Sequence, residues 1–295
     1  MKKIVLVTGL SGMVGNRIRE LMSKDYDLID LSLKSGTDIT DEDQIKKVVE
    51  SSEANTILHM AAKTDVDSCE DDKLLNDEGM AWRVNVIGTE NIVSSAQKTG
   101  KRVIYISTDF VFDGTKDTYT EKDEPNPVNW YGYTKYLGED SVLKGSDRNT
   151  VLRIAYPYRA HFPEKKDFVR RMLEKISNKE KILALTDHIM TPTFIDDIVL
   201  ALREFFENEH PGIYHLVGSD SMSVIDAVKK IGEVFQYKVN AEPVTRDIFF
   251  KDRAFRPFKL ALKNDKIRNL AIKMNSFEEG LRVMKKQMNT RDFLL

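Results

Sequence analysis

Tyr131 and Lys135 are spaced so that they could act together on a proton. They lie four residues apart in a segment with helical spacing, so we expect the phenol and the ammonium on one helix face. A free tyrosine has a pKa of about 10, and a neighbouring cation favours the phenolate, which eases proton transfer near neutral pH. Tyr133 projects from another side of the helix, so Tyr131 is the better candidate acid.

Ser107 and Thr108 end a predicted strand, where a hydroxyl could hydrogen-bond a substrate oxygen beside the tyrosine. We select Thr108 as that hydroxyl. A polar strand end is common in purely structural positions, and so is a tyrosine four residues before a lysine. A glycine loop, a strand-end hydroxyl and a tyrosine four residues before a lysine, in this order, are more specific together than each is alone. The combination favours catalysis.

The glycine loop lies between a β-branched strand at residues 4–7 and a segment with helical spacing. Gly9, Gly12 and Gly15 permit a tight turn, close approach of the backbone to a pyrophosphate and close packing of helix on sheet. The amides of the helix N-terminus add positive potential for the phosphates. The alternative is an ordinary glycine-bearing turn. We predict dinucleotide binding by Gly9, Ser11, Gly12, Met13 and Val14.

The end of the second strand, at residues 28–31, bears on the choice of dinucleotide. NAD enzymes often place an acid there for the ribose hydroxyls, whereas this chain has Ser32. We expect Asp30 to alternate away from the binding edge and to serve as a structural carboxylate. Ser32, Lys34 and Arg17 could accept a 2′-phosphate, so we predict NADP(H) in preference to NAD(H).

Strands and helices alternate along the first half of the chain, which predicts an α/β fold of the Rossmann type with a doubly wound parallel sheet. Ligands of such sheets sit beyond the carboxyl ends of the strands. We predict a dinucleotide-binding domain at residues 1–155, rejoined by about 190–218, and a smaller, interleaved substrate-binding domain at 156–189 and 219–295. The predicted strands are 4–7, 28–31, 56–61, 103–107, 151–155 and 212–217, and the predicted helices include 43–50, 80–97, 131–143, 168–176, 196–207 and 223–235.

Composition excludes several classes of protein. The 295 residues are 41% hydrophobic and 31% charged, and the net charge of −2 provides no field for gathering nucleic acid or anionic lipid. No apolar segment approaches the length of a membrane span of about 20 residues. Cys69 is the single cysteine, so an internal disulfide and a cysteine-built zinc site are excluded and a reducing cytoplasm is favoured.

Several other polar residues have a structural interpretation beside a functional one. His59 lies in an apolar strand, which favours a hydrogen-bonded core histidine over a catalytic base. Asp67 and Glu70 either contact substrate or cap the next helix. The basic group Lys165, Lys166, Arg170 and Arg171 is interpreted as a solvated helix face rather than a diphosphate site, and the pairs Asp196-Asp197 and Glu278-Glu279 as helix-dipole partners rather than metal ligands. We predict no metal site.

The motifs together resemble the extended short-chain dehydrogenase/reductase family. The resemblance rests on Thr8-Gly9-x-x-Gly12-x-x-Gly15, His59-Met60-Ala61-Ala62, Asn85 with Gly88-Thr89-Glu90-Asn91, Ser107-Thr108-Asp109 and Tyr131-x-x-x-Lys135. Within that family the chain is most similar to the dTDP-4-dehydrorhamnose reductases, through Thr64-x-Val66-Asp67-x-x-Glu70, Ser107-Thr108-Asp109-Phe110-Val111-Phe112-Asp113-Gly114, Tyr131-Gly132-Tyr133-Thr134-Lys135, Pro192-Thr193 and Arg256-Pro257.

The resemblance implies the reduction of the 4-keto group of a nucleotide-linked sugar by NAD(P)H. The dehydratases of the extended short-chain dehydrogenase/reductase family carry an Asp-Glu pair after the catalytic threonine. In this chain Asp109 is followed by Phe110, which disfavours dehydration. The implied catalytic residues are Thr108, Tyr131 and Lys135. Further implied cofactor contacts are Asp38, Ile39, Ala61, Ala62, Lys63 and Tyr156, and the implied substrate contacts are Val66, Asp67, Thr108, Asp109 and Arg256.

Two other functions remain open at this stage. One is a sugar-nucleotide epimerase of the same family. The other is a non-catalytic, cofactor-binding regulatory subunit similar to that of methionine adenosyltransferase. The intact set of Thr108, Tyr131 and Lys135 favours an enzyme. A nucleotide sugar is the expected partner, and a homodimer is possible.

Overall fold

The structure, a computed structural model, describes residues 2–289 and divides the chain into two compact units. The first unit comprises Met1–Phe112, Glu124–Arg153 and Val199–Tyr214, and the second comprises Asp113–Asp123, Ile154–Ile198 and His215–Leu295. Two differences from the predicted limits stand out. The segment Asp113–Asp123 belongs to the second unit, and the returning segment is shorter than residues 190–218. The assignment of substrate binding to the second unit stays a prediction.

A six-stranded sheet with the order β10-β5-β4-β3-β1-β2 organises the first unit. The pairs β1–β2, β1–β3 and β3–β4 are parallel, and their register aligns Thr8 with His59 and His59 with Tyr105. The carboxyl ends of β1, β3 and β4 therefore lie at one edge of the sheet. The strands are β1 Lys3–Thr8, β2 Tyr26–Leu31, β3 Thr56–His59, β4 Arg102–Thr108, β5 Thr150–Ile154 and β10 Gly212–His215.

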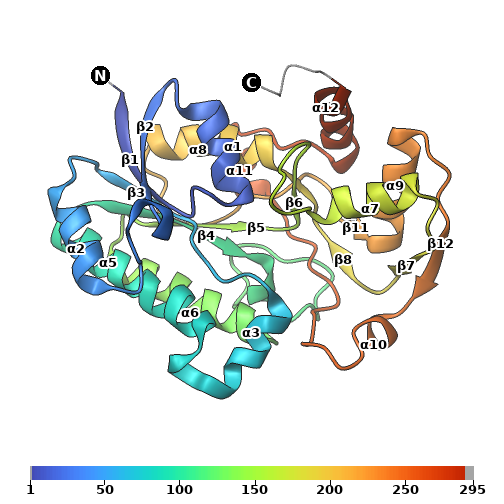
Figure 1. The fold of residues 1–295 in the computed structure, drawn as a ribbon, viewed down its shortest axis with the longest axis horizontal. Coiled ribbons are helices and arrows are strands. Elements are labelled where there is room, and N and C mark those ends of the chain that lie inside the picture. The colour runs from blue at the N-terminus through green and yellow to red at the C-terminus, as the bar shows by residue number, and fades with distance from the viewer. Residues whose placement is uncertain (1, 290–295) are drawn as a thin grey trace. The chain divides into compact units, whose positions relative to one another are not determined.

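Helices cover both faces of this sheet (Figure 1). Helices α2, α5 and α6 form one layer over a core that includes Leu6, Ile57 and Val103, and α1 and the first-unit part of α8 lie on the other face. The α/β fold with a doubly wound parallel sheet is thus confirmed. The helix bounds are α1 Met13–Met22, α2 Glu42–Ser51, α3 Val66–Asp72, α4 Met80–Trp82, α5 Gly88–Lys98, α6 Trp130–Gly145 and α8 Ile195–Glu207. None of the helices within residues 2–289 is long and apolar enough to span a bilayer.

One predicted helix, at residues 80–97, is interrupted. A π-helical turn, Arg83–Ile87, separates α4 from α5. It contains Asn85, whose side chain is fully buried and hydrogen-bonded outside the helix. Such turns occur often at functional sites.

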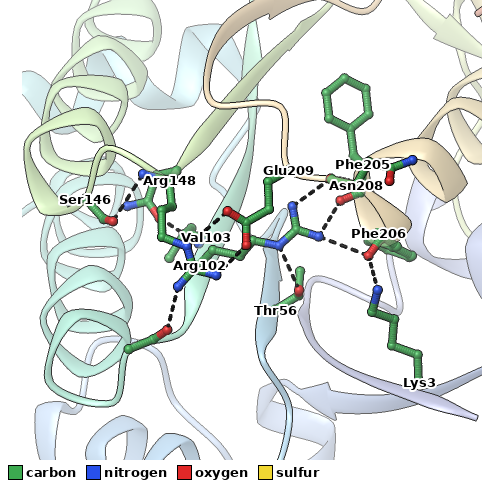
Figure 2. A network of polar contacts seen from close by, with 12 residues as sticks. Lys3, Thr56, Arg102, Val103, Ser146, Arg148, Phe205, Phe206, Asn208 and Glu209 are labelled. Atoms are coloured by element: carbon green, nitrogen blue, oxygen red, sulfur yellow. Dashed lines mark hydrogen bonds and ion pairs between the residues drawn. The ribbon is translucent and has the colours of Figure 1, made fainter. Parts of the chain in front are cut away.

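The amino ends of the strands meet a dense polar network centred on Arg102 (Figure 2). Its Nε donates to the Thr56 hydroxyl at 3.1 Å, and its Nη1 donates to the Asn208 carbonyl at 3.0 Å. Nη2 donates to the carbonyls of Phe205 and Phe206 at 2.6 and 3.0 Å. The last carbonyls of a helix lack partners within it, so Arg102 caps α8 and its charge suits the negative end of the helix dipole.

Helices α7, α9 and α12 and several short strands form the second unit around its own apolar core. Asp167 and Ser223 cap the starts of α7 and α9. The remaining elements are β6 Pro157–Tyr158, α7 Phe168–Ser177, β7 Ile182–Leu185, β8 Ile189–Met190, β9 Thr193–Phe194, β11 Met222–Ser223, α9 Val224–Phe235, β12 Ala241–Val244, α10 Arg246–Phe249, α11 Asp265–Arg268 and α12 Phe277–Asn289.

Candidate active site

The glycine loop between β1 and α1 has the shape of a phosphate cradle. Gly9 has a φ of +72°, and a Cβ there would come within 2.8 Å of the Ala61 amide nitrogen. Gly12, the N-cap residue of α1, brings no side chain to the helix start. A Cβ at Gly12 would contact only the Gly9 carbonyl oxygen, at 3.2 Å, and would otherwise project into open space. The loop therefore fits a dinucleotide pyrophosphate, which needs close backbone approach at a helix N-terminus.

Hydrogen bonds through Thr8 and His59 connect this loop with the end of β3. The Thr8 hydroxyl accepts from the amides of Met60 and Ala61, both at 3.0 Å, so its own proton points to His59 Nδ1 at 2.7 Å. His59 Nε2 then donates to Thr89 at 3.0 Å. Burial lowers the pKa of His59 to about 3, in keeping with this neutral tautomer. The predicted role of His59 as a hydrogen-bonded core residue is confirmed. The same bonds end β3 at residue 59 instead of the predicted 61.

Asn85 is a positioning residue to which the sequence analysis gave no role of its own. Its side chain accepts from the Lys63 amide at 2.8 Å and donates to the Lys63 carbonyl at 3.1 Å and to the Thr134 hydroxyl at 3.0 Å. Thr134 in turn donates to the Tyr131 carbonyl at 3.0 Å. Asn85 thus joins the segment after β3 to the helix that carries the predicted acid. Its position in a helical pattern gave no sequence signal beyond the family motif.

Two side chains fix the start of α6. Asn129 Oδ1 accepts from the Gly132 amide at 2.8 Å, and Glu70 Oε2 accepts from the Trp130 amide at 2.8 Å. Glu70 therefore caps a helix, but this helix is α6 and not the next helix along the chain, as one of its two predicted alternatives had it. A Cβ on Gly132 would come within 2.1 Å of the Phe110 carbonyl oxygen, so the glycine lets α6 approach the turn after β4 closely.

Tyr131 lies on α6 beside that turn. Its ring packs edge-on against Phe110 at 5.8 Å, in the turn that follows Thr108. Burial raises the pKa of Tyr131 well above its ordinary value, and the nearby side chain of Thr108 acts in the opposite direction. This differs from the expectation that Lys135 favours the phenolate, because the desolvation of the phenol outweighs the other effects on it. Tyr131 is therefore held in its protonated form.

Lys135 is almost fully buried one helical turn further along α6. Its Nζ donates to the Ile106 carbonyl at 2.9 Å and lies 3.9 Å from the centre of the Tyr105 ring. Burial lowers the pKa of Lys135 to about 7, and the charge of Glu139 acts in the opposite direction. The ammonium is thus held by one carbonyl and one aromatic face, both from β4.

Thr108 and Asp109 form the turn that ends β4. The Phe110 amide donates to Thr108 Oγ1 at 3.3 Å, and Thr108 Oγ1 donates to Asp109 Oδ1 at 3.1 Å. Asp109 is 2% exposed, and its Oδ2 is buried without a hydrogen-bond partner among the described residues. Burial raises the pKa of Asp109 to about 7, although hydrogen bonds from Thr108 and two amides lower it.

Comparison with known proteins identifies the family. The model of the RmlD substrate binding domain matches residues 1–290. The chain belongs to this family. The dTDP-4-dehydrorhamnose reductase of Mycolicibacterium smegmatis is 32% identical over 87% of this chain and 76% of its own length. The crystal structure of dTDP-4-dehydrorhamnose reductase from Bacillus anthracis in complex with NADP superposes with a TM-score of 0.89 at 31% identity, over 97% of this chain and all of the other.

A different function occurs among the relatives as well. Methionine adenosyltransferase 2 subunit beta from Bos taurus is 28% identical over 78% of this chain and 72% of its own length. The RmlD-family chain described here is therefore similar both to reductases and to a subunit of a transferase.

The end of β2 places Asp30 and Ser32 together in this RmlD-family chain. Residues two apart in an extended segment share a face, and Ser32 donates to Asp30 Oδ2 at 3.1 Å. Arg19 of α1 lies 3.5 Å from the same oxygen, and the predicted role of Asp30 as a structural carboxylate stays a prediction. Arg17 is buried and paired with Glu20 at 2.7 Å.

The other cofactor and substrate residues of the first unit are placed as follows. Ser11, Met13 and Val14 are partly exposed at the α1 start, and so are Ala61, Ala62 and Lys63 after β3. Asp38 accepts from the Thr40 amide and hydroxyl, both at 2.9 Å, and Ile39 belongs to the core. Val66 and Asp67 form the first turn of α3. Their predicted ligand contacts stay predictions.

Tyr156 and Arg256 belong to the second unit. Tyr156 has a φ of +41°, and its hydroxyl bonds His188 Nε2 at 2.6 Å. His188 Nδ1 lies 2.8 Å from the Pro257 carbonyl, which can only accept, so Nδ1 carries the proton and Tyr156 donates to Nε2. Arg256 stacks on Phe250 with its guanidinium carbon 4.7 Å from the ring centre. The predicted roles of Tyr156 and Arg256 are not tested by these contacts.

Two of the four basic residues at 165–171 have acidic partners, and the other two are exposed. Arg170 pairs with Asp167 at 2.6 Å and Lys166 with Glu174 at 2.6 Å, while Lys165 and Arg171 are exposed. Both acidic pairs lie in first turns, of α8 and α12. Within residues 2–289, no three His, Cys, Asp or Glu side chains gather as a metal site would require.

Proposed function

We propose that this protein reduces the 4-keto group of a nucleotide-linked sugar, with dTDP-4-dehydrorhamnose as its substrate. It is an NAD(P)-dependent oxidoreductase of the extended short-chain dehydrogenase/reductase type. The observation that carries the proposal is the position of Tyr131 beside the turn that follows Thr108, with Lys135 one turn along the same helix. These three residues lie in the same compact unit as the glycine cradle.

The protein's own residues supply the proton chemistry of this reaction. When bound, the reduced nicotinamide provides the hydride. Tyr131 donates its proton to the oxygen of the ketone, and its raised pKa keeps that proton in place near neutral pH until the oxygen becomes basic. Thr108 hydrogen-bonds and polarises the same carbonyl. Lys135, held by Ile106 and Tyr105, orients the ribose.

We propose NADP(H) as the preferred cofactor. Asp30 is engaged by Ser32 and Arg19, which offset the charge that would repel a 2′-phosphate at the end of β2. Lys34 is exposed next to this strand end and could pair with the phosphate. The substitution Lys34→Ala should raise the KM for NADPH and leave the KM for NADH unchanged. Equal changes for both cofactors would contradict this assignment.

The assay that tests the main proposal uses purified protein, dTDP-4-dehydrorhamnose and either reduced cofactor, followed by the loss of nicotinamide absorbance. We expect turnover, with the cofactor exchanging between cycles. An epimerase would retain its nicotinamide during purification and would isomerise the sugar with no net oxidation. Tight cofactor binding without reduction of any 4-keto sugar nucleotide would instead favour the regulatory role of the transferase subunit. A cytoplasmic location and a homodimer stay predictions.

A further inference from the structure

Glu139 of α6 and Arg153 of β5 form a buried ion pair in the first unit. Arg153 Nε donates to the two carboxylate oxygens of Glu139 at 2.9 and 3.2 Å, and Nη2 donates to Oε2 at 2.6 Å. The two side chains are 0% and 2% exposed, and the reduction mechanism assigns no step to either. Desolvation offsets much of the attraction in a buried pair, so fold stability alone does not explain two buried charges here.

Glu139 lies on the same face of α6 as the catalytic residues Tyr131 and Lys135. The three residues follow one another at intervals of four along one helix, and side chains at this spacing are neighbours. Lys135 and Glu139 are 2% and 1% exposed. The ammonium and the carboxylate therefore come from adjacent turns in a region that excludes water, where the attraction between charges is weakly screened.

The ammonium of Lys135 has no carboxylate in direct contact within residues 2–289. Its contacts are the Ile106 carbonyl at 2.9 Å and the face of Tyr105, whose ring centre is 3.9 Å away. The Tyr105 ring also lies against the next turn of α6, because a Cβ on Gly138 would come within 2.3 Å of the Tyr105 hydroxyl oxygen. A buried ammonium with these partners is costly, and a negative charge in the same region reduces the cost.

The other titratable groups nearest Lys135 carry no negative charge near neutral pH. Burial raises the pKa of both Tyr131 and Tyr105, so both phenols stay protonated. His59 of β3 is neutral, because burial and then the charge of Lys135 lower its pKa to about 3. Burial lowers the pKa of Lys135 to about 7, and the charge of Glu139 acts to raise it. Glu139 is therefore the negative charge that acts on this ammonium.

Further charges face α6 from the elements around it. Glu70 of α3 accepts from the amide at the start of α6, and Asp109 lies in the turn after β4, where burial raises its pKa to about 7. Arg153 is bonded to Glu139. The pKa of Lys135 responds to burial and to Glu139 rather than to these three groups.

We propose that Glu139, fixed by Arg153, is a positioning residue that provides the countercharge of Lys135 and so lets the lysine orient the cofactor ribose as a cation. The inference rests on the proposed reductase function, in which Lys135 has that role. Arg153 binds both carboxylate oxygens, which favours the charged form of Glu139 despite its burial.

The first experiment measures the dissociation constants of NADPH and NADH against pH, by cofactor fluorescence, for the wild type and Glu139→Gln. The amide keeps the shape and can still accept from Arg153, but it has no charge. The wild-type affinity should decline as pH rises through about 7, because Lys135 loses its proton. The decline in the variant should lie lower by about one pH unit or more. Its affinity should therefore be several-fold weaker at pH 7 and equal to that of the wild type at low pH.

The matched control is Asp140→Asn, the same kind of change on the same helix. Asp140 pairs with Lys144 at 2.6 Å, and its side chain is 42% exposed, so water screens its charge. The binding profile of this variant should coincide with that of the wild type. An equal shift in Asp140→Asn would show that the loss of any carboxylate from α6 has this effect, and would overturn the assignment to Glu139.

A double variant, Glu139→Met with Arg153→Met, distinguishes the countercharge from packing. Apolar side chains of similar size often replace a buried ion pair without loss of stability, whereas removal of one partner is strongly destabilising. The double variant should fold and should keep the lowered decline of Glu139→Gln, which it replaces if that variant fails to fold. A double variant with the wild-type profile would make the pair a packing element only.

The outcomes separate this inference from the function on which it rests. Cofactor binding needs no sugar, so a wild type that reduces no 4-keto sugar nucleotide would overturn the proposed function and leave the binding profiles as the test of Glu139. An active wild type whose Glu139→Gln variant keeps the wild-type binding profile would overturn the countercharge alone. Equal weakening of binding at every pH would also overturn it, because the cause would then be a disturbed fold and not a lost charge.

Discussion

The two ends of strand β4 differ in how well their buried polar groups are hydrogen-bonded. At its amino end, Arg102 uses Nε, Nη1 and Nη2 to bind one hydroxyl and three carbonyls, so a buried cation is surrounded by acceptors. At its carboxyl end, Ser107 Oγ and Asp109 Oδ2 are buried without a partner among the described residues. Residues 103–106 of one strand therefore separate Arg102, whose three nitrogens are all hydrogen-bonded, from Ser107, whose hydroxyl is not.

The difference shows how one strand can serve stability and chemistry at once. Unsatisfied buried polar atoms cost free energy, and in native proteins they require an explanation such as a functional role. The network at Arg102 joins β3, β4 and the end of α8, and so offsets part of that cost elsewhere in the same unit. We therefore expect changes at the amino end to affect stability and changes at the carboxyl end to affect activity.

The largest expected effect is on activity at the carboxyl end. Tyr131→Phe removes the proton donor but keeps the packing against Phe110, so kcat should fall by about 10²–10⁴-fold. The midpoint of thermal unfolding should change little. Steady-state reduction assays and calorimetry on the same preparation measure both. Retained turnover would remove Tyr131 from the mechanism.

The next effect is on stability at the amino end. Arg102→Ala leaves the terminal carbonyls of α8 without their donors, which should lower the free energy of unfolding by about 2–4 kcal/mol. Turnover per folded molecule should remain that of the wild type. Urea denaturation and active-site titration test the two statements. Arg102→Lys keeps the charge with fewer donors, so its free energy of unfolding should lie between those of the wild type and Arg102→Ala. A loss of kcat in either variant would contradict the separation of roles.

Asp109→Asn should increase stability while it reduces activity. The folded pKa of about 7 lies above that of an unfolded aspartate, so the folded state retains a proton between about pH 4 and pH 7 that the unfolded state has lost. Asp109 therefore contributes destabilisation that grows across this window and is complete above it. The variant should gain on the order of 1–3 kcal/mol at pH 8 and almost nothing at pH 4, as measured by denaturation at both values. A gain independent of pH would contradict this origin.

The smallest effect concerns the start of α6. Asn129→Ala removes the side-chain acceptor of the Gly132 amide and should cost about 1 kcal/mol of unfolding free energy. Glu70 still accepts from the Trp130 amide, so the helix should keep its start and kcat should fall less than twofold. Chemical denaturation and the reduction assay measure these values. In the double variant with Glu70→Ala, which removes the acceptor of the Trp130 amide, a larger than additive loss would show that the two caps act together.

The sequence predicts the alternating fold and the three residues Thr108, Tyr131 and Lys135 because their signals are local. Periodicity places helices and strands, and an i, i+4 spacing places two side chains on one face. The glycine spacing similarly identifies the loop after β1. These signals do not depend on how distant segments pack.

The sequence does not reveal features that depend on packing between distant segments. The helical pattern of the sequence does not distinguish Asn85 from its neighbours. Its role depends on two hydrogen bonds that its side chain makes with the Lys63 backbone from a π-helical turn. The direction of the Tyr131 pKa shift follows from burial, which no spacing reports. Arg102 falls within the predicted region of a buried strand, and its partners on α8 are more than a hundred residues further along the chain.

The discontinuous composition of the first unit has a consequence for biosynthesis. Its sheet includes β10, and its last segment, Val199–Tyr214, follows some 45 residues that belong to the second unit. A nascent chain on the ribosome therefore cannot complete its first unit until residue 214 has emerged. Fragments that stop before residue 199 lack the carbonyls that Arg102 binds, and we expect them to be held by chaperones or degraded rather than released as folded intermediates.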